Sequence, residues 1–190
     1  RQAATKFYTQ QKVFTTLKVQ SNLIPIGSYE FAIYQWRFHG IREDLILQPI
    51  SSAEGITVQL SRLLEKAEDF TPSDPIAIDS RIWDELDAQH YKLWLEARKK
   101  HQQHTKELAE YRRESLSSSH RARIAQLGEQ CRQADDEKIK KMRESQIATA
   151  EADYARHIQD LDISMERADI IAEPVAYGII EVVGDAAYAK

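Results

Sequence analysis

Two histidines, His101 and His104, stand three residues apart in the string HQQH and are the first candidates for chemistry. On a helix, side chains at this spacing share one face, so the two imidazoles could bind one zinc ion. Zinc sites of this kind take a third protein ligand, and His90 lies too far along the same helix to supply it. A polar interruption of a helical seam explains the pair better, so we predict no metal site and no cofactor.

A second candidate is the run Ser117-Ser118-Ser119-His120, which sets hydroxyl groups beside an imidazole. Residues adjacent in sequence do not face each other on a helix, and no GxSxG turn presents a nucleophile. Neither GxxxxGK(S/T) nor GxGxxG occurs, so the sequence carries no phosphate-binding loop of these types. We therefore expect no catalytic residues and a chain that is not an enzyme, and we interpret the serines as a weak point in a long helix.

Basic residues form the third candidate site. Between Arg98 and Arg143 there are thirteen Lys or Arg and seven Asp or Glu, a net charge of +6 within a chain of net charge −4. Lys and Arg on a projecting helix can reach backbone phosphates, and with Tyr111 as the one aromatic residue nearby the contact would not depend on base sequence. The residues predicted to bind nucleic acid are Arg98, Lys99, Lys100, Arg112, Arg113, Arg121, Arg123, Lys138, Lys140, Lys141 and Arg143. A solvated helix whose cations pair with Glu at i±4, as Lys106 and Glu110 could, is the alternative.

The composition agrees with a folded chain that spends many residues on an elongated, solvated element. The apolar fraction is 42%, the charged fraction 29% and the mean hydropathy −0.56. No run of 18 apolar residues occurs, and the N-terminus lacks the apolar stretch of a signal peptide, so we expect a cytoplasmic protein without membrane contact. Cys131 alone cannot form an internal disulfide. The chain begins with Arg1 rather than Met, which indicates a fragment of a larger protein.

The element that must position these residues is a long helical region over residues 76 to 173. All five prolines lie outside it, and Gly128 is its one glycine. Because proline costs ~3 kcal/mol and glycine ~1 kcal/mol in a helix, their scarcity over this span is a strong helix signal. Apolar residues recur at spacings of three and four in a narrow stripe, which is typical of a coiled-coil seam. The stripe runs through Trp83, Leu86, His90, Leu93, Ala97, Leu108, Tyr111, Leu116, Ile124, Leu127 and Cys131, then Ile139, Met142, Gln146, Ala150, Tyr154, Ile158, Leu161, Met165 and Ala168.

The string Ala134-Asp135-Asp136-Glu137 combines a weak break with acidic N-capping residues, and we place a hairpin tip there. The arms are expected near residues 79 to 133 and 136 to 170. An unbroken helix of 90 residues would be roughly 135 Å long and would leave its stripe unpaired in a monomer. A homodimer of unbroken helices through the coiled coil is the competing arrangement.

The flanking segments predict a small antiparallel β-sheet. Residues 29 to 38 and 45 to 47 predict a β-hairpin, residues 52 to 70 a short amphipathic helix, and residues 175 to 183 a third strand. The first twenty residues are compatible with either a helix or a strand. The fold class is therefore α+β, with a platform from residues 1–75 and 171–190 and a helical hairpin from residues 76–170. The predicted members of the platform core are Phe31, Trp36, Leu45, Leu47, Ile179 and Val182.

Several strings of the chain, taken together, resemble a known family. They are NLIPIGSYEFAIYQWRFHGIREDLIL, RRESLSSSHRARIAQLGEQ, EKIKKMRESQIATAEADYARHI and ADIIAEPVAYGIIEV. They are similar to the region after the motor in large bacterial and archaeal superfamily-2 helicases of the Swi2/Snf2 type. The resemblance implies a C-terminal accessory domain of a DNA-dependent ATPase, separated from its motor. None of the ATPase motifs occurs here, so no catalytic residue is carried over.

We therefore expect a non-catalytic accessory domain of a Snf2-like helicase or translocase, whose helical hairpin contacts nucleic-acid backbone or a partner subunit. The alternative from another class is a coiled-coil scaffold that binds only protein. Salt dependence separates the two, because phosphate contacts weaken steeply with added salt.

Overall fold

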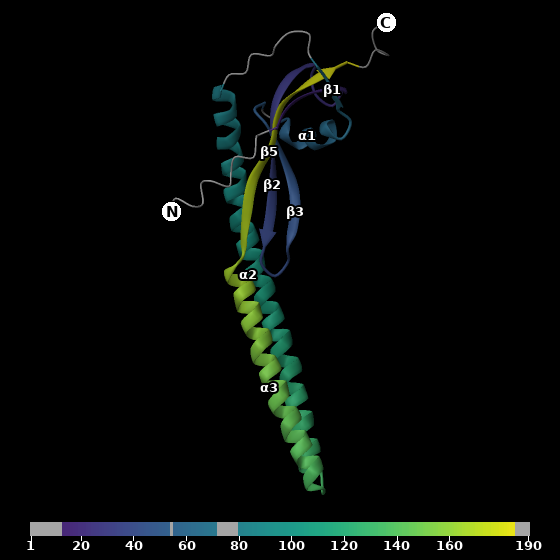
Figure 1. The fold of residues 1–190 in the computed structure, drawn as a ribbon, viewed down its shortest axis with the longest axis vertical. Helices are drawn as coiled ribbons and strands as arrows, with labels where there is room; N and C mark the ends of the chain where they lie inside the picture. The colour runs from purple at the N-terminus through teal and green to yellow at the C-terminus, as the bar shows by residue number, and fades with distance from the viewer. Residues whose placement is uncertain (1–12, 54, 72–79, 185–190) are drawn as a thin grey trace. The chain divides into compact units, whose positions relative to one another are not determined.

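The described part of the chain folds into a β-sheet with a short helix, α1, and the long helices α2 and α3 (Figure 1). The computed structural model describes residues 13–53, 55–71 and 80–184. In chain order its elements are β1 (Val13–Gln20), β2 (Gly27–His39), β3 (Asp44–Ser51), α1 (Thr57–Leu64), β4 (Glu68–Asp69), α2 (Ser80–Arg132), α3 (Glu137–Glu166) and β5 (Asp169–Val183). The predicted α+β class is confirmed at this level.

The sheet is mixed and has five strands in the order β3-β2-β5-β1-β4. Strand β1 pairs in parallel with β5 from Val13↔Ala176 to Gln20↔Val183, and pairs in antiparallel fashion with β4. The predicted antiparallel sheet of three strands is therefore wrong in both respects. The β-branched run Val13 to Thr16 favours a strand, which resolves the ambiguity of that segment. The predicted neighbours β2 and β3 are confirmed. The short helix predicted over residues 52 to 70 is present, but it covers only Thr57–Leu64, and β4 at Glu68–Asp69 occupies the end of the predicted range.

An apolar core lies between the sheet and α1. Phe31 of β2, Val19 of β1 and Ile180 and Val182 of β5 pack there with Leu60 and Leu63 of α1. Gly178 lets β1 and Phe31 approach this part of β5, since a Cβ atom there would stand 2.7 Å from Phe31 Cζ. Burial of Phe31, Trp36, Ile179 and Val182 is confirmed.

The prediction that Leu45 and Leu47 are core residues is wrong. Their side chains are 54% and 58% exposed, and Ile46 between them is also exposed. The physical reason is position, because β3 stands at the edge of the described sheet, next to β2. A run of apolar residues in the sequence cannot distinguish an edge strand from a central one.

The chain divides into two compact units. The sheet unit lies within Arg1–Arg37, Leu45–Glu96 and Ile171–Lys190 and includes the first turns of α2. The helical unit comprises Phe38–Asp44 and Ala97–Ile170. The domain division at residue 75 falls outside the described residues and stays a prediction.

In the sheet unit, a buried polar cluster holds α2 against the strands. Asp87 of α2 accepts hydrogen bonds from the hydroxyls of Tyr34 and Tyr177. Trp36 Nε1 donates to His90 Nε2 at 2.8 Å, and the His90 ring stacks on Tyr34 with centroids 3.5 Å apart. Burial and the hydrogen bond to Asp87 raise the pKa of Tyr34, so this hydroxyl stays protonated and donates.

In the helical unit, α2 and α3 lie side by side (Figure 1). Arg113 pairs with Asp162, the ring of His120 stacks on Tyr154 with centroids 4.3 Å apart, and the Cys131 thiol contacts the Lys140 carbonyl at 3.9 Å. These contacts join successively later residues of α2 to earlier residues of α3. The helix break predicted at residues 134 to 137 is confirmed, since α2 ends at Arg132 and the Asp136 side chain caps α3 by accepting from the Lys138 amide.

Buried and half-buried positions in the helical unit recur every eleven residues. On α2 the series are Thr105, Leu116, Leu127 and Ala109, His120, Cys131. On α3 they are Ala150, Leu161 and Arg143, Tyr154, Met165. Eleven residues correspond to 3.67 per turn, a longer period than the 3.5 of a heptad seam.

Four members of the predicted stripe are exposed, namely Leu93, Tyr111, Ile139 and Met142. On α2, a stripe drawn through the large apolar residues drifts off the contact face, which holds the small buried residues Thr105 and Ala109 instead. The second arm also ends earlier than predicted. Helix α3 stops at Glu166, and the string from Asp169 to Glu173, expected to be helical, opens β5.

Candidate interaction surface on helices α2 and α3

The eleven residues predicted to bind phosphate divide into two groups by exposure. The exposed ones are Lys99, Lys100, Arg112, Arg121, Arg123, Lys138 and Lys141. The half-buried ones are Arg98, Arg113, Lys140 and Arg143. The exposed group lies mainly on α2, where Lys99 and Arg121 are two eleven-residue repeats apart and therefore share a face, roughly 33 Å from each other along the axis.

Arg98 and Arg113 form ion pairs within the helical unit. Arg98 Nε lies 2.5 Å from Asp169 Oδ1, and its Nη2 lies 3.0 Å from Oδ2, a two-point contact. Burial raises the pKa of Asp169, but the hydrogen bond from Arg98, the Ile170 amide and the charges of Arg98 and His101 outweigh it and hold that pKa below its usual value. Arg113 likewise pairs with Asp162. These two arginines therefore stabilise the helical unit.

The acidic residues that meet these arginines come from α3 and its end. Residues 97 to 125 hold eight Lys or Arg and three Asp or Glu, whereas residues 144 to 170 hold two and seven. The observed ion pairs bring the two stretches together. The basic excess of residues 97 to 125 can be counted in the sequence. That residues 144 to 170 supply its acidic partners follows only from the alignment of the two helices. The field of the basic stretch is weaker than its own charge indicates.

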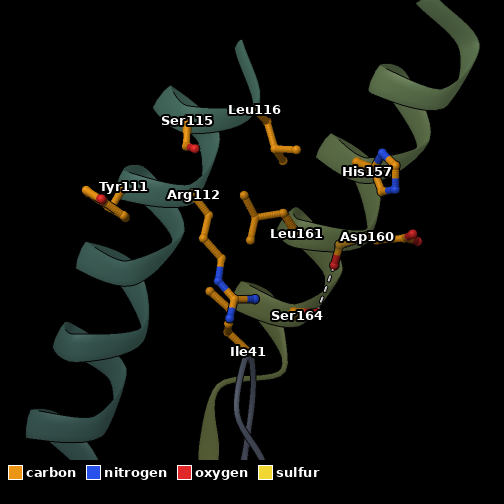
Figure 2. A pocket seen from close by; sticks show the side chains of 9 residues that line it. All are labelled: Ile41, Tyr111, Arg112, Ser115, Leu116, His157, Asp160, Leu161 and Ser164. Carbon is orange, nitrogen blue, oxygen red and sulfur yellow. Dashed lines mark hydrogen bonds between the residues drawn. The ribbon is translucent and has the colours of Figure 1, made fainter. Parts of the chain in front are cut away.

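A hollow of about 410 Å³ opens between the two helices (Figure 2). Its residues come from α2, from α3 and from Ile41 in the turn between β2 and β3. Leu116 and Leu161 point toward each other across it, and the Arg112 side chain runs along it toward Ile41. Tyr111 stands at the rim, 72% exposed. On α3 the Ser164 hydroxyl donates to the Asp160 carbonyl at 2.8 Å.

The hollow combines an apolar wall with one guanidinium and one exposed phenol. Tyr and Arg are among the residue types that contribute most binding energy at protein–protein contacts. Sequence reasoning placed Arg112 on a phosphate-binding face and Tyr111 in the helical seam, so it missed this hollow. In the sequence, only the eleven-residue repeat of small residues on α2 could have indicated the hollow.

The two histidines considered as zinc ligands lie in different environments. His101 Nε2 is 2.8 Å from the His39 carbonyl, and its ring meets Phe38 edge-on at 5.1 Å. This contact ties α2 to the end of β2, whereas His104 is exposed. Among the described residues, no group of three His, Cys, Asp or Glu could hold a metal ion.

The serine run, where the sequence predicted a weak point, is continuous helix within α2. His120 turns its ring to Tyr154 of α3 rather than to a serine hydroxyl. The Ser117 carbonyl accepts a hydrogen bond from Arg121 Nε at 3.4 Å. The imidazole therefore serves as a packing surface between the helices.

Comparison of the sequence with protein-family models and with curated proteins finds no match in either. None of the described helices is both long and apolar enough to cross a membrane.

Proposed function

We propose that the chain is a non-catalytic accessory domain of a Snf2-like DNA helicase or translocase, acting in the cytoplasm. In this proposal α2 and α3 form an antiparallel coiled-coil hairpin that contacts the backbone of nucleic acid without regard to sequence. The observation that carries it is the set of exposed cations on α2 and at the start of α3, above all Lys99, Arg121, Arg123 and Lys141. Because Arg113, His120 and Cys131 contact α3 of the same chain, the proposal favours a hairpin within one molecule over a homodimer through the coiled coil.

Contact with phosphates requires exposed positive charge and cations spaced to match the phosphates, and the helical unit provides both. Lys99 and Arg121, roughly 33 Å apart on one face, could meet phosphates separated by about one turn of duplex. Each phosphate neutralised releases counterions, so binding should weaken linearly in log salt with a slope near −0.9 per contact. Arg98 and Arg113 do not enter this surface, since their guanidinium groups are held by Asp169 and Asp162.

A fluorescence anisotropy titration with random-sequence duplex DNA tests the proposal. We expect binding at ~50 mM salt that falls steeply by ~200 mM. The double variant Lys99→Glu/Arg121→Glu should weaken binding at least about tenfold and reduce the salt slope by about 2.

A matched control is available in the sheet unit. Arg62 and Lys66 are exposed on and just after α1, and Arg62→Glu/Lys66→Glu changes the net charge by the same amount. If both doubles lose affinity equally, the effect is one of total charge and the α2 face is not the contact. Absence of binding by the unaltered chain at ~50 mM salt would remove the nucleic-acid proposal altogether.

A second candidate function, a scaffold that binds only protein, is favoured by the hollow between α2 and α3. Charge on the basic stretch is already partly offset by Asp162 of α3 and Asp169 at the start of β5. Tyr111, Arg112 and Leu161 offer an apolar surface with one cation. Under this alternative the DNA titration is negative, and association with a partner changes little with salt because apolar contacts are not screened.

A further inference from the structure

We infer that the hollow between α2 and α3 binds a small monocarboxylate that carries an apolar chain or ring. The inference goes beyond both proposed functions, because this ligand is neither nucleic acid nor a partner protein. It begins from Arg112, which lines the hollow and whose guanidinium group pairs with no carboxylate of the described residues. By contrast, Arg98 and Arg113 of the same helix are each held by an aspartate.

The acidic residue in the lining does not serve as the partner of Arg112. Figure 2 shows the Asp160 carboxylate pointing away from the Arg112 guanidinium. The backbone carbonyl of Asp160 is occupied as well, since it accepts the hydrogen bond from the Ser164 hydroxyl. The hollow therefore presents an unpaired positive charge, and the ligand that complements it is an anion.

The residues around this charge favour a carboxylate over a phosphate. The planar fork of N–H donors on a guanidinium group matches the two oxygens of a carboxylate. A phosphate monoester carries a charge of about −2 and calls for more than one cation, whereas Arg112 is the one Lys or Arg among the described lining residues. Leu116 and Leu161, which face each other across the hollow, would also oppose the burial of a strongly hydrated dianion. They suit an apolar group attached to the carboxylate instead.

The dimensions of the hollow limit the size of that apolar group. On α3 the lining residues lie within 157–164, which corresponds to roughly 10 Å along the helix axis. One turn beyond Leu116, the ring of His120 stacks on Tyr154 and bounds the space on that side. Ile41 lines the opposite end (Figure 2). A bounded volume of about 410 Å³ lies within the range of small-molecule pockets and suits one compact ligand.

An NMR titration of the isotopically labelled chain with octanoate tests the inference. Octanoate is the probe because it joins one carboxylate to a short apolar chain. For a ligand of this size we expect a dissociation constant on the order of 1 mM, with saturable shifts of the Leu116 and Leu161 amide signals. Acetate lacks the apolar chain and octanol lacks the charge, so each should bind at least about fivefold more weakly.

A pair of variants separates the Arg112 contact from general charge attraction. Arg112→Gln should raise the dissociation constant for octanoate at least about fivefold. Lys106→Gln is the matched control, because it removes an exposed cation of the same helix that lies outside the lining, and it should leave octanoate binding unchanged. Equal losses in the two variants would overturn the inference, since the attraction would then follow total charge.

Two further results would also overturn the inference. Octanol that binds as tightly as octanoate would show that the hollow does not recognise a carboxylate. Absence of any saturable shift with octanoate would show that the hollow takes no ligand of this class and would leave it to a side chain of a partner protein.

Discussion

Replacing Gly178 by alanine is expected to lower the free energy of unfolding by about 3 kcal/mol, the upper end of the usual cost of overpacking. The added Cβ would meet the Thr15 carbonyl oxygen of β1 and the Phe31 ring, 2.7 Å from its Cζ atom. The ring belongs to the buried core and the carbonyl to the parallel ladder of β1 and β5. Neither can move without loss of packing or of strand pairing.

Denaturant unfolding followed by circular dichroism measures this effect. Gly128→Ala is the matched control, because Gly128 lies inside α2 and nothing stands within 4 Å of its added Cβ. That substitution should stabilise the chain by up to ~1 kcal/mol through helix propensity. Equal and small effects at the two positions would contradict the close approach of β1 to Gly178.

The second large expected effect is a loss of stability at acidic pH that depends on His90. Burial lowers the pKa of His90 to about 4, although the charge of Asp87 opposes the shift. The ring must be neutral to accept the bond from Trp36 Nε1. Unfolded His titrates near ~6.5, so between ~6.5 and ~4 the unfolded state binds more protons. As the pH is lowered from ~6.5 to ~4, the free energy of unfolding should therefore decrease by up to ~1.4 kcal/mol per pH unit, roughly 2 to 3 kcal/mol in total.

The pH dependence of His90→Gln isolates this contribution from other acid-sensitive groups. Gln cannot titrate and can still accept from Trp36, so the stability difference between the original chain and this variant should shrink as pH falls. His104→Gln, at an exposed position of the same helix, should keep the original pH dependence. Parallel stability curves for the original chain and His90→Gln from pH ~7 to ~4 would show that His90 is not buried in its neutral form.

Local signals in the sequence were sufficient for much of the secondary structure. The absence of Pro and the single Gly predict the long helices, and the Asp135-Asp136-Glu137 string predicts the break between them. Local signals could not predict which distant segments pair as strands. The parallel alignment of β1 with β5 joins segments about 160 residues apart, and no short pattern encodes it. The edge position of β3 depends on the same strand order, which is why Leu45 and Leu47 were placed in the core.

The candidate site shows the same division between local and long-range information. Exposed Lys and Arg are visible in the sequence because clusters of like charge are a local property. The pairing of Arg98 with Asp169 and of Arg113 with Asp162 depends instead on which residues of α3 and of the start of β5 stand beside α2. That alignment follows an eleven-residue period carried by small residues such as Thr105, Ala109 and Ala150. A search for large apolar residues at heptad spacing misses it.

The eleven-residue period makes the length of the helical pair adjustable in steps. Removing residues 117–127 from α2 and 147–157 from α3 deletes one full period from each, opposite one another as judged by the contact of His120 with Tyr154. Both helices would shorten by roughly 16 Å while the remaining contact faces keep their register. A deletion of seven residues from each should instead rotate the contact faces apart and lower the melting temperature, as a thermal scan of the two shortened chains would reveal. Related chains could thus differ in reach by whole periods while the contacts between the helices stay the same.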